Sequence, residues 1–176
     1  MKGKRNGARS GGLLKIKGGS KMKKRYYIAY GSNLNVEQMR LRCPDAAIVG
    51  TAMLKGYELV FKGSKTGSYL TIEESEGGEV PVAVWAVSAA DEKRLDLYEG
   101  YPQFYYKLED IPLTVKHPEM GWTKKVKAFV YVMDESRTYG VPSSYYMRVC
   151  HEGYKHFGFE LGYLIEAYRK SERRTA

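Results

Sequence analysis

Glu99 is an acidic residue in surroundings that would raise the pKa of its carboxyl group. It follows a predicted helix over residues 89–98, so the negative end of the helix dipole would oppose its charge by roughly 0.3–1 kcal/mol. Tyr98, Tyr101 and Pro102 flank it and would limit its contact with water. Both effects disfavour the carboxylate, and a raised pKa suits a general base or acid. The alternative is a solvated glutamate at the end of a helix.

Residues 30–34, with the sequence Tyr-Gly-Ser-Asn-Leu, form a second candidate site. The aromatic and β-branched residues before Gly31 predict a strand, and Asn35 is placed to cap a helix after it. A strand that turns into a helix exposes backbone N–H groups near the positive end of the helix dipole, and such groups bind carboxylates. The alternative is an ordinary strand-to-helix connection, so this segment by itself does not establish a site.

The remaining reactive residue types form no metal or cofactor motif. Residues 63–67 look like a phosphate-binding loop, but they lack the Gly-Lys-Ser/Thr order that such loops require. The two cysteines, Cys43 and Cys150, match no zinc spacing, and we expect free, buried thiols. The three histidines, at positions 117, 151 and 156, share no ligand spacing with the carboxylates. We therefore expect neither a metal ion nor an organic cofactor.

The positive charge of the chain is concentrated at its N-terminus. The 176 residues carry a formal net charge of +9, but residues 1–25 hold ten Lys or Arg and no acidic residue, which leaves residues 26–176 close to neutral. The same segment is rich in glycine, so we expect a flexible tail over residues 1–24. It is either a leader, with Met22 as the natural start, or a basic arm that contacts nucleic acid or anionic lipid. For the folded domain we expect no nucleic-acid partner.

Hydropathy argues against a membrane protein. Hydrophobic residues make up 43% of the chain, but no stretch approaches the roughly 20 apolar residues that a membrane-spanning helix needs. The N-terminus also lacks the apolar core of a signal peptide. We therefore expect a soluble, cytoplasmic protein without a membrane partner.

Strand patterns come first along the chain and helix patterns last. Strands are predicted at residues 25–30, 48–49, 57–61, 69–72, 80–87, 105–115 and 126–133, and helices at 35–42, 89–98, 143–156 and 160–172. Gly50, Gly56 and an acidic turn at 74–79 are expected to separate the early strands. This order, without a βαβ repeat, predicts one α+β domain over residues 25–172 with a curled sheet or small barrel. Residues 173–176 are expected to form a C-terminal tail.

Several segments together resemble the gamma-glutamylcyclotransferase (AIG2-like) family. The two candidate sites carry most of the resemblance, as Tyr-Gly-Ser-Asn-Leu at 30–34 and Leu-Asp-x-x-Glu-Gly at 95–100. The other similar segments are residues 41–46, 82–87 and 142–146, the last followed by Gly153. The resemblance extends from about residue 26 to about residue 167, which is nearly the whole folded part.

This resemblance implies an enzyme that cleaves gamma-glutamyl amides by internal attack. The substrate's own α-amine attacks its γ-carbonyl, and the products are 5-oxoproline and a free amine or amino acid. No water, metal or organic cofactor is consumed. The resemblance also implies a mixed β-barrel flanked by helices, a small-molecule substrate and a possible homodimer. The form of the turn at 30–34 favours gamma-glutamyl amino acids over gamma-glutamyl amines, and glutathione is less favoured.

The motif match assigns roles to particular residues. Glu99 is implied as the general base and acid, with Tyr98 and Tyr101 as pocket walls. Gly31 and Ser32 would supply backbone donors to the glutamyl carboxylate or the developing oxyanion, and Asn33 would hold the turn together. The residues implied at the substrate site are Tyr27, Ile28, Ala29, Tyr30, Gly31, Ser32, Asn33 and Tyr146, whose hydroxyl would close the pocket. The alternative is a binding or regulatory module that recognises glutamyl-like ligands without turnover.

Overall fold

Five strands, four α-helices and one short 3-10 helix make up the computed structural model, which describes residues 23–64 and 67–175. The expected tail over residues 1–24 lies outside the described residues except for Lys23 and Lys24. The strands are β1 (Arg25–Ala29), β2 (Ala47–Ser64), β3 (Gly67–Val87), β4 (Tyr105–Lys116) and β5 (Thr123–Met133). The helices are η1 (Ser32–Leu34), α1 (Val36–Arg42), α2 (Ala89–Glu99), α3 (Ser144–Phe157) and α4 (Gly162–Thr175). None of these helices is long and apolar enough to cross a membrane.

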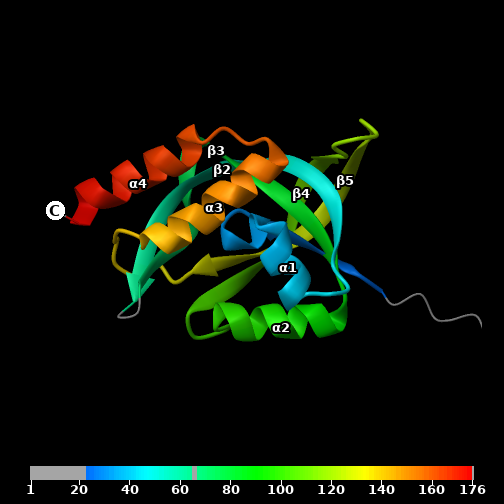
Figure 1. The fold of residues 1–176 in the computed structure, drawn as a ribbon, viewed down its shortest axis with the longest axis horizontal. Helices are drawn as coiled ribbons and strands as arrows, with labels where there is room; N and C mark the ends of the chain where they lie inside the picture. The colour runs from blue at the N-terminus through cyan, green and yellow to red at the C-terminus, as the bar shows by residue number, and fades with distance from the viewer. Residues whose placement is uncertain (1–22, 65–66, 176) are drawn as a thin grey trace, which may run out of the picture.

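The strands close into a barrel in the order β1-β3-β2-β4-β5 (Figure 1). β1 lies between β3 and β5, with Tyr27 opposite Trp85 in an antiparallel pair and opposite Phe129 in a parallel pair. The other pairs are antiparallel. The expected α+β class with a small barrel is therefore confirmed. Because β1 is paired on both sides, the barrel also fixes the position of the turn that follows it.

β2 and β3 are longer than the sequence suggests. The expected breaks at Gly50 and Gly56 are shifts of register within one continuous strand. Gly56 has a φ of +82°, a left-handed conformation that favours glycine and accommodates the irregularity. The segment at 74–79, expected as a turn, lies within β3, where residues 75–78 bulge out opposite Gly56. The predicted separations were wrong because a glycine in a strand also permits a bulge.

α2 begins and ends at the residues that the sequence singles out. The Ser88 hydroxyl oxygen accepts a hydrogen bond from the N–H of Asp91 at 3.1 Å, and the Asp91 carboxylate accepts one from the N–H of Ser88 at 3.4 Å. This reciprocal pair is a capping box. At the other end Gly100 has a φ of +66° and its N–H bonds back to the last turn. Glu99 is therefore the final residue of α2.

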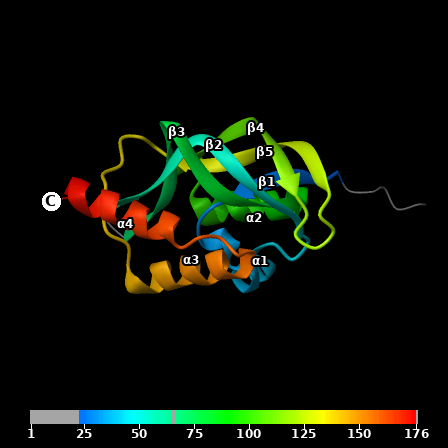
Figure 2. The same cartoon turned by 90° about the horizontal axis from the view of Figure 1, so that it is seen from above.

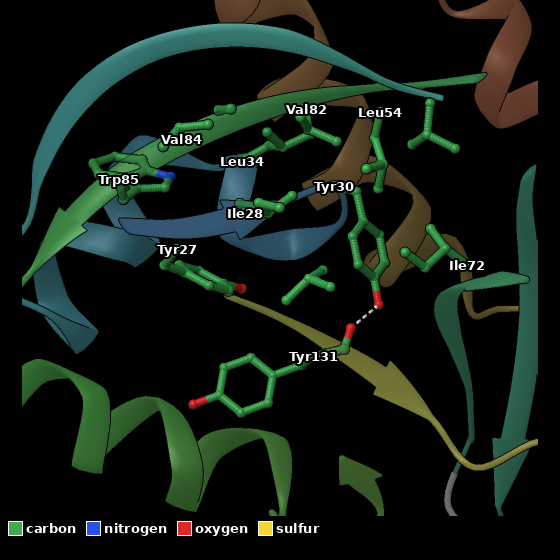
Figure 3. Close-up of a cluster of buried hydrophobic side chains, with 14 of the residues drawn as sticks. Tyr27, Ile28, Tyr30, Leu34, Leu54, Ile72, Val82, Val84, Trp85 and Tyr131 are labelled. Carbon is green, nitrogen blue, oxygen red and sulfur yellow. Dashed lines mark hydrogen bonds between the residues drawn. The ribbon is translucent and has the colours of Figure 1, made fainter. Parts of the chain in front are cut away.

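Aromatic side chains of β1 and β5 pack together on the face of the sheet that α2 covers, where the Tyr131 hydroxyl donates to Asp96 of α2 (Figure 3). The Tyr30 hydroxyl donates a hydrogen bond to the carbonyl of Tyr131 at 2.6 Å. The Tyr27 ring lies 5.4 Å from the Phe129 ring and 5.7 Å from the Tyr131 ring, measured between centroids. The contacts of Tyr27 and Tyr30 hold both ends of residues 27–30, the segment that leads into the turn at η1.

α3 packs directly against η1, on the side of the barrel where α1 also lies (Figure 2). A Cβ atom at Gly153 would lie 2.5 Å from the Cβ of Leu34 and 2.7 Å from its carbonyl carbon, so only glycine permits this approach. Asn35 links the same elements, since its side chain caps α1 and donates to Glu152 of α3 at 2.9 Å. The expected cap at Asn35 is confirmed, whereas the short helix η1 before it was missed.

α4 continues to Thr175, so the tail expected from residue 173 is wrong for the residues that the structure describes. Arg173 pairs with Glu166 at 3.3 Å, and Arg174 lies 3.6 Å from a carboxylate oxygen of Glu58. Positive charges in the last turn also interact favourably with the helix dipole. Arg173 and Arg174 therefore belong to the last turn of α4 and not to a tail.

Replacing Gly153 by alanine tests the contact between α3 and η1. We expect Gly153→Ala to lower the free energy of unfolding by about 1–3 kcal/mol, because the new methyl group overlaps Leu34. Gly162→Ala is the matched control: a Cβ there meets open space, and alanine in a helix adds up to about 1 kcal/mol. Denaturant unfolding measures both variants, and equal stabilities would contradict the close approach.

Candidate active site

The carboxyl group of Glu99 faces the turn that follows β1. The side-chain nitrogen of Asn33 donates a hydrogen bond to Glu99 Oε1 at 2.9 Å, across 66 positions in the sequence. Asn33 is 3% exposed, and Glu99 is largely shielded from solvent. The fold therefore brings the two candidate sites of the sequence into direct contact.

Asn33 is bonded through both atoms of its amide group. Arg42 Nη1 donates to Asn33 Oδ1 at 2.6 Å, so the amide nitrogen is turned toward Glu99. The same nitrogen donates to the hydroxyl oxygen of Tyr27 at 2.8 Å. Since the Tyr27 oxygen accepts this bond, its own hydrogen remains available to a ligand. Asn33 thus joins β1, η1, α1 and the end of α2.

Two adjoining cavities lie beside Glu99. The inner cavity has a volume of about 30 Å³ and the outer cavity about 220 Å³. They share four lining residues: Ser32, Glu99, Tyr105 and Tyr146. The outer cavity is otherwise walled by the aromatic residues Tyr69, Tyr98 and Phe104. Both cavities therefore border Glu99.

Burial raises the pKa of Glu99 to about 7. The charge of the Arg42 guanidinium and the hydrogen bond from Asn33 act in the opposite direction and limit the rise. The raised pKa agrees with the prediction from the sequence, and desolvation is its main cause. The two flanking tyrosines differ: Tyr98 lines the outer cavity, whereas Tyr101 lines neither cavity and packs against Tyr131.

Most residues expected at the substrate site line the inner cavity. They are Tyr27, Tyr30, Gly31, Ser32, Asn33, Glu99 and Tyr146. Ile28 and Ala29 line neither cavity and are buried in the core instead; Figure 3 shows Ile28 there. Successive strand residues face opposite sides, so Ile28 points away from the side that Tyr27 occupies. The side chain of Ala29 is a single methyl group that ends within the core.

Gly31 and Tyr146 meet at the wall of the inner cavity. The Tyr146 hydroxyl oxygen accepts a hydrogen bond from the N–H of Leu70 at 3.2 Å. A Cβ at Gly31 would lie 3.1 Å from that oxygen, so glycine leaves space where a side chain would press on it. The N–H groups of Gly31 and Ser32 donate to no residue that the structure describes. Both remain available to an anionic ligand, as the sequence predicts for this turn.

The sequence analysis missed six residues at or beside the site: Tyr69, Leu70, Phe104, Tyr105 and Tyr131 line the cavities, and Arg42 bonds Asn33. Tyr105 of β4 lines both cavities, and its hydroxyl donates to the carbonyl of Leu70 at 2.9 Å. It lies in an ordinary strand pattern that carries no functional signal. Arg42 lies in the segment 41–46, which the family resemblance includes but to which it gives no role. Both contacts depend on tertiary structure.

The two cysteines lie outside this chemistry. Cys43 and Cys150 are free and buried, as the sequence predicts. Burial raises the pKa of each thiol to about 12, so neither is a thiolate at neutral pH. Within residues 23–64 and 67–175, no group of three or more His, Cys, Asp or Glu is arranged to hold a metal ion.

A larger hollow of about 890 Å³ lies away from Glu99 and is more open to solvent. Three of its six charged side chains are paired with one another. Lys62 Nζ forms an ion pair with Glu73, and Arg174 lies 3.6 Å from the same carboxylate. The hollow is open to solvent and contains neither of the two candidate sites of the sequence, so the smaller cavities beside Glu99 are the better candidate.

Two features characterise the structure: a closed five-stranded barrel, and a carboxyl group at the end of α2 that faces the turn after β1. Comparison with known proteins shows which family has them. The family model described as "Gamma-glutamyl cyclotransferase, AIG2-like" matches residues 27–148. Two curated proteins named "Gamma-glutamylcyclotransferase" align over 144 residues, 78% of this chain and 73% of each relative: Bos taurus at 35% identity and Homo sapiens at 31%. A solved structure titled "Gamma-glutamyl cyclotransferase" matches with a TM-score of 0.68 at 29% identity, covering 87% of both chains. The chain belongs to the gamma-glutamyl cyclotransferase, AIG2-like family.

The raised pKa of Glu99 predicts how stability changes with pH. Between the ordinary value of 4.5 and about 7 the folded protein binds this proton and the unfolded chain does not, so stability falls as the pH rises through this range. Glu99→Gln removes the charge and keeps an oxygen that can accept from Asn33. We expect this variant to be more stable than the wild type near pH 8, by roughly 1–3 kcal/mol.

The same comparison near pH 5 is the control, because the wild-type carboxyl group is then mostly protonated in the folded state. We expect most of the difference to disappear there. Denaturant unfolding at both pH values measures it. A difference that is equal at the two pH values would contradict a buried carboxyl group with a raised pKa.

Proposed function

We propose that the protein is a gamma-glutamylcyclotransferase that releases 5-oxoproline from gamma-glutamyl compounds. The observation that carries the proposal is the Glu99 carboxyl group, which lies beside a cavity and has a pKa of about 7. A group with this pKa can both accept and donate a proton near neutral pH. The names of the relatives at 31% and 35% identity support the same activity.

The proposed reaction needs little beyond positioning and proton transfer. Glu99 takes a proton from the substrate's α-ammonium group, and the free amine attacks the γ-carbonyl carbon. The bond from that carbon to the leaving nitrogen breaks as Glu99 returns the proton to this nitrogen. The attacking nitrogen loses a second proton when it becomes the ring amide, and this proton passes to the released amine, which departs as an ammonium. Because both reacting groups belong to one molecule and close a five-membered ring, holding the reactive conformer supplies much of the rate.

Backbone and hydroxyl donors around the inner cavity would hold the substrate. The N–H groups of Gly31 and Ser32 have no partner among the described residues, so they can bind the glutamyl carboxylate or the oxyanion that develops on the γ-carbonyl. The free hydrogen of the Tyr27 hydroxyl is a third donor at the same cavity. Glu99, on the same lining, would face the α-amine.

The outer cavity would receive the leaving group. Its walls are mainly aromatic, with Tyr69, Tyr98 and Phe104 around its volume of about 220 Å³. Aromatic faces accommodate apolar side chains of varied shape. The proposed leaving group is an amino acid or a related amine, and a panel of gamma-glutamyl amino acids, peptides and amines would define its preference.

Glu99→Gln tests the proposed proton transfer. We expect the variant to bind gamma-glutamyl compounds and to lose 5-oxoproline formation by at least about a hundredfold, because the amide cannot accept the ammonium proton. Glu119→Gln is the matched control, since Glu119 is exposed in the turn between β4 and β5. Mass spectrometry of 5-oxoproline measures all three proteins.

Two outcomes would contradict the proposal. Normal turnover by Glu99→Gln would exclude Glu99 as the base. Binding without turnover by the wild type, across the whole panel, would instead indicate a module that recognises glutamyl-like ligands.

A further inference from the structure

Arg42, the last residue of α1, is held in place by three side chains. Its Nη1 donates to Asn33 Oδ1 at 2.6 Å and its Nη2 to Gln38 Oε1 at 2.6 Å. The guanidinium also lies over the Tyr98 ring, with Cζ 3.6 Å from the centroid. Arg42 lines neither cavity beside Glu99, so a direct contact with substrate is not its role.

The side-chain amide of Asn33 can lie in two orientations that exchange its oxygen and its nitrogen. They occupy nearly the same space but have opposite effects on the Glu99 carboxylate. With its nitrogen toward Glu99 it donates a hydrogen bond, and with its oxygen toward Glu99 it would repel the carboxylate. A guanidinium only donates hydrogen bonds, so Arg42 binds the oxygen of the amide and not its nitrogen. We infer that Arg42 is a positioning residue that fixes the Asn33 amide so that its nitrogen faces the base Glu99. This inference rests on the proposed function for its catalytic meaning.

Arg42 also supplies positive charge to the surroundings of Glu99. The other groups that face this carboxyl group are phenols, whose pKa values are raised by burial so that they are uncharged at neutral pH: Tyr27, Tyr30, Tyr98, Tyr105, Tyr131 and Tyr146. One turn earlier on α2, Asp96 is paired with Lys107 at 2.7 Å. The charge of Arg42 therefore opposes the effect of burial and keeps Glu99 able to ionise near neutral pH.

The shape of the guanidinium matters as well as its charge. It is planar and presents a fixed fork of N–H groups, so it can bond two side chains and stack on Tyr98 at the same time. A lysine at this position would keep the charge but offer a flexible point donor. Arg42→Lys should therefore retain the electrostatic contribution and lose part of the control over the Asn33 amide.

The test compares Arg42→Met, Arg42→Lys and Arg40→Met in the full-length protein. Arg40 lies on the same short helix and is exposed, so its variant removes one charge without touching Asn33. Two quantities are measured against pH: the kcat for 5-oxoproline release, and the carbon-13 chemical shift of the Glu99 carboxyl group. The second readout does not depend on activity.

For Arg42→Met we expect both titrations to move up by roughly one pH unit, with kcat on the acidic side lowered about tenfold. Arg42→Lys should shift less, and Arg40→Met should match the wild type. If Arg42→Met does not fold, the reduced shift and lowered kcat of Arg42→Lys carry the test. A wild-type titration in both Arg42 variants would overturn the inference, and so would a loss of kcat that is the same at every pH.

Failure of the proposed function gives a different result. If the wild type and Arg40→Met release no 5-oxoproline from any gamma-glutamyl compound, the enzymatic proposal fails. The carbon-13 titration then still decides whether Arg42 controls the ionisation of Glu99.

Discussion

The Glu99 carboxyl group is partly shielded from water in the fold and receives one direct hydrogen bond from the described residues, from Asn33 at 2.9 Å. A neutral amide compensates only part of the hydration that a carboxylate loses, so burial raises the pKa of this group to about 7. A protein selected only for stability would gain by exposing this side chain or pairing it directly with a cation. Burial of this carboxyl group lowers the stability of the fold at pH values above the ordinary pKa of a glutamate. A site that works by proton transfer accounts for this loss of stability.

The elements around Glu99 are placed by contacts that have nothing to do with acid–base chemistry. The capping box at Ser88 and the left-handed Gly100 fix the two ends of α2 and therefore the position of its last residue. Pairing of β1 on both edges fixes the start of the turn, and Gly153 lets α3 press against it. The site is thus assembled by the barrel and its helices.

The sequence predicted the local elements of the candidate site where a residue type and its local pattern were sufficient. The helix end at Glu99 and the glycine turn before Asn33 are local features, and the fold brings them together as the family resemblance implies. Ile28 lines neither cavity because it faces the side of β1 opposite to Tyr27, and Ala29 lines neither because its side chain is a single methyl group within the core. Arg42 could not be recognised because its partners depend on tertiary structure. The long strands were divided because a glycine bulge and a glycine turn look alike in sequence.

The central claim is that the glutamyl group of a substrate binds beside Glu99 with its α-amine facing the carboxyl group. The most direct measurement is a crystal structure of the Glu99→Gln variant, which should not turn over, with a gamma-glutamyl amino acid bound. The account predicts the α-nitrogen about 3 Å from the substituted side chain, and the glutamyl carboxylate or γ-carbonyl oxygen at the N–H groups of Gly31 and Ser32. Density for the ligand in the hollow beside Lys62, or with its amine turned away from position 99, would contradict it.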